Sequence, residues 1–95
     1  MPSSPSELLM PGGEPLGVAG SRPQIREVPG GPKEAQELFD ELTVGATAVT
    51  PPGYPGVLKE LPSGGRIGYR PASKSGPPTI DVDIPGIDID KIKFL

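Results

Sequence analysis

Hydrophobic and polar residues alternate along the last third of the chain, which is the pattern of strands with one buried face. The clearest case is the run TIDVDI at residues 79–84, where three branched apolar side chains alternate with Thr79, Asp81 and Asp83. The same alternation occurs in two further runs, Arg66–Arg70 (RIGYR) and Asp90–Leu95 (DKIKFL). These patterns predict three strands whose apolar side chains share one face of a sheet.

A different period marks the segment KEAQELFDELT. Its apolar residues Ala35, Leu38, Phe39 and Leu42 follow the i, i+3, i+4, i+7 spacing of one helix face. Proline suits the first turn of a helix, and Pro32 stands there. The spacing therefore predicts a helix over residues 32–43, with its apolar stripe against the sheet.

The other elements follow from turn signals. Gly56–Leu61 ends at the turn PSGG and is expected to form a hairpin with the strand Arg66–Arg70. Gln24–Val28, between two prolines, is expected to be a short edge strand at most. The predicted fold class is α+β, with one N-terminal helix packed on a four-stranded antiparallel sheet and preceded by a flexible Pro/Gly-rich lead.

Composition divides the chain unevenly. It holds 14 Gly and 15 Pro among 95 residues, and 13 of those 29 lie in the first 32 residues. Such a stretch is typical of a linker. We therefore expect residues 1–22 to form a flexible linker and residues 23–95 to form a single small domain.

The residue types that are missing narrow the chemistry. The chain has neither cysteine nor histidine, so acid–base chemistry would depend on carboxylates, Lys, Tyr or an activated water. It has no 18-residue apolar run and no signal-peptide pattern, so we expect no contact with a membrane. The net charge of −3 argues against a dedicated high-affinity DNA-binding protein. Residues 56–95, with six basic and five acidic side chains, are nevertheless slightly basic at +1.

Charge gathers on the polar side of the predicted sheet. Alternation places four cations there, Arg66, Arg70, Lys91 and Lys93. They are expected to surround Asp81 and Asp83, and Gly68 would leave room for a ligand between them. The loop before TIDVDI adds Lys74 and Ser75. An ordinary solvated sheet face with cross-strand ion pairs remains the alternative interpretation.

Neighbouring residues are expected to have simpler roles. A divalent metal between Asp81 and Asp83 is disfavoured by four cations on the same face. Asp88 and Asp90 are expected to be turn and surface residues. Parity places Tyr69 under the helix rather than in the site.

Three runs, LMPGGEPLGVAGSRPQIREVPGG, AQELFDELT and PPGYPGVLKELPSGGRIGYRPASKSGPPTIDVDIPGIDIDKIKF, resemble the C-terminal ribonuclease toxin domains of bacterial polymorphic toxins. Such domains lie at the C-termini of contact-dependent growth inhibition proteins and of Rhs-type effectors. The most similar group is called novel toxin 21. The resemblance spans residues 9–95 and is most specific over Arg66–Phe94. It implies a barnase–EndoU–colicin–RelE-like fold and a metal-independent endoribonuclease that acts in the cytoplasm of target bacteria. It also implies a cognate immunity protein as partner.

The resemblance places the active-site region at Lys74, Ser75, the run from Pro78 to Asp83, and Lys91. The chemistry of RNA cleavage then assigns roles to individual residues. Asp81, Asp83 and Lys91 would be catalytic, one carboxylate as general base for 2′-OH attack and the lysine at the leaving group. RNA would be bound by six further residues: Arg66, Arg70, Lys74, Ser75, Thr79 and Lys93. No metal or cofactor is implied. The substrate would be 16S rRNA or, as the second choice, tRNA. The chain has no tryptophan to stack on a base.

Two other functions remain open from the sequence. One is a non-catalytic binding module at the end of a secreted exoprotein, which would tolerate loss of a carboxylate. The other is a metal-dependent DNase toxin, whose activity a chelator would abolish.

Overall fold

The computed structural model of the chain describes residues 5–54, 56–62, 64–70 and 78–95. Two short helical segments come first, α1 (Pro5–Leu9) and the 3₁₀ turn η1 (Pro11–Gly13), and the main helix is α2 (Pro32–Leu42). The strands are β1 (Val18–Ala19), β2 (Ile25–Val28), β3 (Thr47–Ala48), β4 (Val57–Glu60), β5 (Arg66–Arg70), β6 (Thr79–Asp83) and β7 (Lys91–Phe94).

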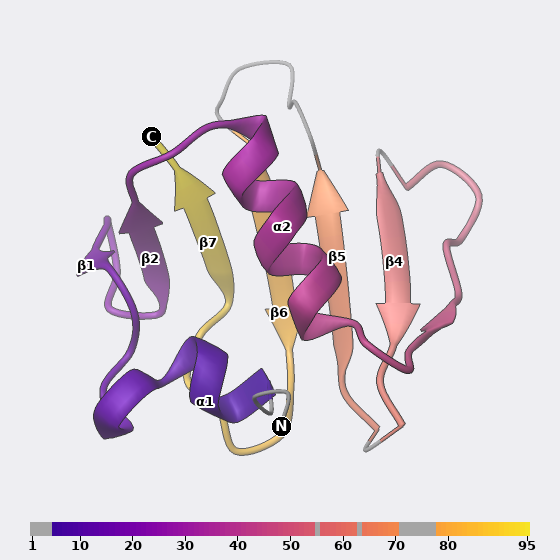
Figure 1. Ribbon diagram of the computed structural model, residues 1–95, viewed down its shortest axis with the longest axis horizontal. Helices are drawn as coiled ribbons and strands as arrows, with labels where there is room; N and C mark the ends of the chain where they lie inside the picture. The colour runs from indigo at the N-terminus through magenta and orange to yellow at the C-terminus, as the bar shows by residue number, and fades with distance from the viewer. Residues whose placement is uncertain (1–4, 55, 63, 71–77) are drawn as a thin grey trace.

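The strands form a single seven-stranded sheet in the order β1-β2-β7-β6-β5-β4-β3 (Figure 1). All neighbouring strands are antiparallel except β2 and β7, which pair in parallel from Ile25 opposite Lys91 to Val28 opposite Phe94. The predicted four-stranded antiparallel sheet is therefore wrong, because the sheet is mixed and has three more strands.

The missed strands have physical explanations. β1 and β3 contain two residues each, too few to show an alternating period. The segment at 24–28 does form β2, but β1 covers its outer side, so β2 is not an edge strand. Its pairing with β7 joins residues more than 60 positions apart, and such a contact leaves no local signal in the sequence.

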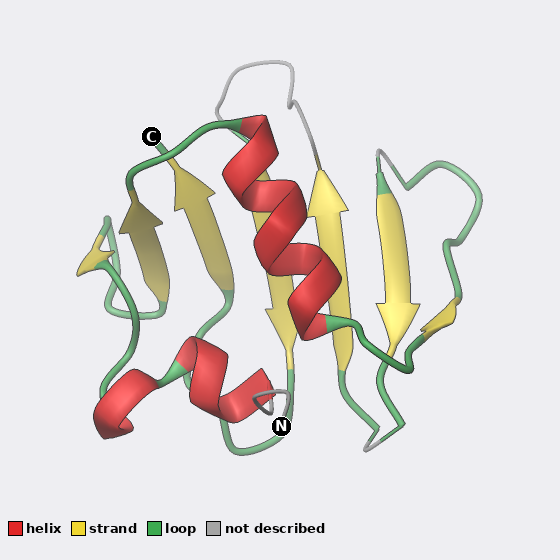
Figure 2. Cartoon of the chain, viewed as in Figure 1, coloured by secondary structure: helices red, strands yellow, loops and turns green. Residues whose placement is uncertain are grey.

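The helix predicted at 32–43 is present as α2 and crosses one face of the sheet over β5, β6 and β7 (Figure 2). Its start is fixed by Glu34, whose carboxylate accepts a hydrogen bond of 2.8 Å from the Gly31 N–H. Ala35, Phe39 and Leu42 are buried against the sheet. Within the described ranges, each helix is too short or too polar to span a bilayer.

The core lies between α2 and the sheet, on the apolar side that alternation predicts. Ile67 and Tyr69 of β5 lie under the helix, where the Tyr69 ring packs 5.5 Å from that of Phe39. The remaining buried sheet residues are Ile80 and Val82 of β6 and Ile92 and Phe94 of β7.

Within the lead, which its composition predicts to be flexible, residues 5–22 include the short elements α1, η1 and β1. Leu9 of α1 is fully buried in the core, and Leu8, Met10 and Leu16 pack against it. Proline and glycine set the turns of this stretch, but its apolar side chains have partners in the core. The division into a linker at 1–22 and a nuclease domain at 23–95 remains a prediction.

Candidate functional site

Seven of the nine predicted site residues lie on the face of the sheet that points away from α2. The strand register places Asp81 opposite Lys91 and Thr79 opposite Lys93 across β6 and β7. It places Asp83 opposite Arg66, and Thr79 opposite Arg70, across β5 and β6. We call these seven residues the polar face; they are Arg66, Arg70, Thr79, Asp81, Asp83, Lys91 and Lys93.

Asp81 is the centre of a hydrogen-bonded network on this face. Its Oδ1 accepts a hydrogen bond of 2.9 Å from Nη2 of Arg70. Its Oδ2 accepts a hydrogen bond of 2.8 Å from the hydroxyl of Tyr54. Nε of Arg70 lies 2.9 Å from the same Oδ2 without the alignment of a hydrogen bond. The carboxylate is therefore held by Arg70 and Tyr54, and 29% of the Asp81 side chain is exposed to solvent.

Tyr54 is the functional candidate that the sequence analysis missed. It lies in the segment between β3 and β4, where no period marks it, and it reaches across β5 to Asp81 on β6. A Cβ added at Gly68 would overlap the Tyr54 hydroxyl. Gly68 therefore does not leave an open space for a ligand, as the sequence predicted, because the end of the Tyr54 side chain fills it.

The network changes the chemistry of Tyr54. Burial raises the pKa of its phenol well above the usual value of 10.0, and the hydrogen bond to Asp81 and the charge of that carboxylate raise it further. The nearby Arg70 cation opposes this shift of the pKa but does not cancel it. Tyr54 is therefore a neutral hydrogen-bond donor at neutral pH.

Asp83, two residues beyond Asp81 on β6, has a different environment. It is exposed, and within the described part of the chain no hydrogen bond or ion pair holds its carboxylate. Arg66, its neighbour on β5, has its Nε 3.7 Å from Oε2 of Glu60, with both side chains about half exposed. Such an exposed pair is weak, so Arg66 remains available to an anion.

The other polar-face residues differ in accessibility. Lys91 and Lys93 are half-buried on β7, and their side chains form no ion pair within the described ranges. Thr79 is only 4% exposed, so little of it is available to an RNA strand. Lys74 and Ser75 lie outside the described residues.

Tyr69, Asp88 and Asp90 lie outside the Asp81 network. The Tyr69 hydroxyl donates to the carbonyl of Pro32 at the start of α2, which agrees with its predicted place under the helix. Burial and the charge of Asp40 raise the pKa of Tyr69. Asp88 and Asp90 are exposed, and Asp90 lies 3.5 Å from Arg22. Among the described residues, no group of three or more Asp, Glu, His or Cys side chains is placed to hold a metal ion.

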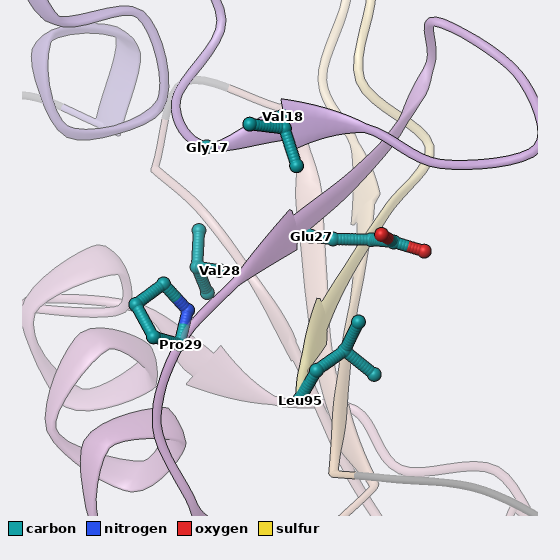
Figure 3. A pocket seen from close by; sticks show the side chains of 6 residues that line it. All are labelled: Gly17, Val18, Glu27, Val28, Pro29 and Leu95. Atoms are coloured by element: carbon teal, nitrogen blue, oxygen red, sulfur yellow. The ribbon is translucent and has the colours of Figure 1, made fainter.

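A pocket lies at the edge of the sheet formed by β1 and β2, beside the end of β7 (Figure 3). Its volume is about 300 Å³, and its lining residues are Gly17, Val18, Glu27, Val28, Pro29 and Leu95. Glu27 and Val28 extend from opposite sides of β2 in Figure 3. The lining offers one carboxylate and no cation, so it does not suit a phosphodiester.

Comparisons with known proteins do not assign a family or a function to the chain. No protein family, curated protein or solved structure matches the chain. The resemblance to toxin ribonucleases therefore remains a hypothesis from the residues of Arg66–Phe94.

Proposed function

We propose that this chain is a ribonuclease toxin domain that cleaves RNA on the polar face. The observation that carries the proposal is the gathering of four cations around Asp81 and Asp83 on a sheet face that no described helix covers. Glu60 and Glu27 lie at the borders of this face, opposite Arg66 and Lys93. Four cations provide the attraction that a phosphodiester needs, and a carboxylate can remove a proton from a ribose 2′-OH. The resemblance of Arg66–Phe94 to toxin ribonucleases supports the same assignment.

Asp83 is the better candidate for the general base. A base must accept a proton from the substrate, and both oxygens of Asp81 already face donors from Arg70 and Tyr54. The exposed Asp83 carboxylate has no such partner in the described chain. Asp81 would instead position Arg70. The contacts between Arg70 and Asp81 use Nη2 and Nε of the guanidinium and not Nη1.

The proposed reaction needs no metal or covalent intermediate. Asp83 takes the proton of the 2′-OH, the 2′-oxygen attacks the adjacent phosphorus, and the bond to the 5′-oxygen breaks. The products are a 2′,3′-cyclic phosphate and a 5′-hydroxyl. Lys91, opposite Asp81, supplies the proton to the 5′-oxygen or offsets its developing charge, while Arg66 and Arg70 hold the phosphate.

The biological setting follows from the resemblance. We propose 16S rRNA as the favoured substrate, with tRNA as the second choice, and a cognate immunity protein as the partner that blocks the site. The domain would be carried by a larger secreted or surface-bound effector and would act in the cytoplasm of target bacteria.

A non-catalytic binding module is the second candidate, and the Asp81 network favours it. A carboxylate that is fully engaged by an arginine and a tyrosine is also what a structural ion pair looks like. In a binding module, loss of Asp83 would leave the phenotype unchanged, and affinity would fall mainly with loss of Lys91, Lys93 or Arg66.

The experiment is expression of the chain in bacteria that lack an immunity gene, followed by profiling of total RNA. The proposal expects growth arrest and a discrete rRNA or tRNA fragment with wild type, and normal growth with Asp83→Asn at equal soluble expression. Healthy growth with wild type at good expression contradicts the toxin assignment. Arrest with DNA breaks that a chelator prevents in vitro would favour a metal-dependent DNase.

A further inference from the structure

The four aromatic residues of the chain divide sharply by location. Phe39, Tyr69 and Phe94 are at most 5% exposed and belong to the core under α2. Tyr54 is the one that contacts the polar face, through Gly68 and Asp81, and it is partly exposed. Any aromatic contact between this face and a ligand must therefore be made by Tyr54.

The Tyr54 ring is fixed in place from two directions. Its hydroxyl end lies directly over Gly68, where any larger residue would displace it, and that hydroxyl is bound to Asp81. The side chain of Leu58 on β4 also lies beside the Gly68 position. A ring held in this way loses little conformational freedom when a ligand packs on it.

The hydroxyl end of Tyr54 also lies close to cations of the polar face. Asp81 joins Tyr54 to Arg70 through its two oxygens, and Lys91 is the register partner of Asp81 on the other side. A planar aromatic surface beside arginine and lysine is the arrangement that binds single-stranded nucleic acid, since bases stack on the ring and phosphates meet the cations. In duplex RNA the base faces are already stacked, so they cannot pack on such a ring.

We infer that Tyr54 is the nucleobase-binding residue of the polar face and that an unpaired base of single-stranded RNA stacks on its ring. This inference rests on the proposed function and adds the form of substrate that the site accepts. The Tyr54 hydroxyl positions the ring through Asp81, and the ring itself supplies the binding. Stacking tolerates all four bases, so Tyr54 selects for unpaired RNA rather than for one sequence.

The test compares two variants, Tyr54→Phe and Tyr54→Leu, with wild type. Binding is measured by fluorescence anisotropy on a short single-stranded RNA whose riboses are 2′-O-methylated and cannot be cleaved. We expect Tyr54→Leu to weaken binding by about 5- to 150-fold, the loss of one stacked base. Tyr54→Phe keeps the ring and should retain most of the affinity. Thermal melts show that each variant is folded.

A second arm keeps the inference testable if Tyr54→Leu fails to fold. Wild type is titrated with a set of the same RNAs, each lacking one base. One abasic position should cost wild type the same 5- to 150-fold that Tyr54→Leu loses, and it should cost folded Tyr54→Leu little more. A duplex of the same sequence should bind more weakly than the single strand.

The outcomes separate the inference from the proposed function. Wild type that cleaves RNA but binds the abasic set and the full strand equally overturns the role of Tyr54 and leaves the ribonuclease assignment intact. Unchanged binding by folded Tyr54→Leu does the same. Wild type that neither binds nor cleaves RNA overturns both.

Discussion

The two faces of the sheet come from the same strands but are organised by different interactions. Under α2, Ile80 and Ile92 pair across β6 and β7 and are fully buried. One residue further along, Asp81 and Lys91 pair on the opposite face, where Tyr54 and Arg70 bind the carboxylate. The helix face is held by apolar contact, which is non-directional, and the polar face by a few directional bonds. Substitutions on the two faces should therefore separate stability from function.

The largest expected effect is on the helix face. Ile80→Ala removes a fully buried side chain and leaves a cavity between β6 and α2, so it should lower the free energy of unfolding by about 2–5 kcal/mol. Urea unfolding at neutral pH measures this loss. A cost below about 1 kcal/mol would contradict the placement of the core.

The next effect is on the Asp81 network. Asp81→Ala leaves Nη2 of Arg70 and the Tyr54 hydroxyl without their acceptor, so we expect the free energy of unfolding to fall by about 1–3 kcal/mol. This residue therefore departs from the behaviour of an exposed carboxylate. The same urea titration applies, and a loss equal to that of Asp83→Ala would show that the network adds nothing to stability.

Gly68→Ala probes the contact between Tyr54 and the sheet. The added methyl group displaces a partly exposed side chain that can rotate away, so the cost should be about 1 kcal/mol, at the low end of overpacking. A double-mutant cycle with Tyr54→Ala isolates the contact, since Gly68→Ala should cost less in that background. Equal costs in both backgrounds would contradict the contact.

A smaller effect appears at high pH. Because the folded pKa of Tyr54 is raised above its ordinary value of 10.0, its contribution to stability is complete below pH 10 and is lost as the pH rises above it. Wild type should therefore lose stability more steeply above pH 10 than Tyr54→Phe does. Tyr69, whose pKa is also raised, remains in both proteins, so the difference belongs to Tyr54. Identical slopes would contradict its burial against Asp81.

Sequence alternation predicted which residues lie on each face of the sheet, but not the other elements that surround them. Successive side chains of a strand point to opposite faces, so Ile80 and Asp81 must lie on different sides of the sheet. The apolar residue of the two then indicates the buried side. The three extra strands and the parallel β2–β7 pair depend on contacts distant in the sequence, which a local period does not report.

Tyr54 was missed for the same reason. Its neighbours PPGYPG are typical of a loop, and the contact with Asp81 spans 27 positions. The available signal was Gly68 itself: a glycine in the middle of a strand often marks a close approach by another group. Gly68 was expected to leave room for a ligand, but the Tyr54 side chain of the same chain fills that space in the structure.

The smallest expected change in stability accompanies the largest expected change in activity. Asp83→Asn replaces an exposed, unpartnered carboxylate, so unfolding should stay within about 0.5 kcal/mol of wild type. The direct test incubates purified wild type and Asp83→Asn with total bacterial RNA in EDTA and identifies the ends of the fragments. The proposal predicts fragments with 2′,3′-cyclic phosphate ends from wild type and none from Asp83→Asn at an equal melting temperature. Full cleavage by Asp83→Asn, or no cleavage by wild type, would contradict the assignment of the polar face as a ribonuclease site.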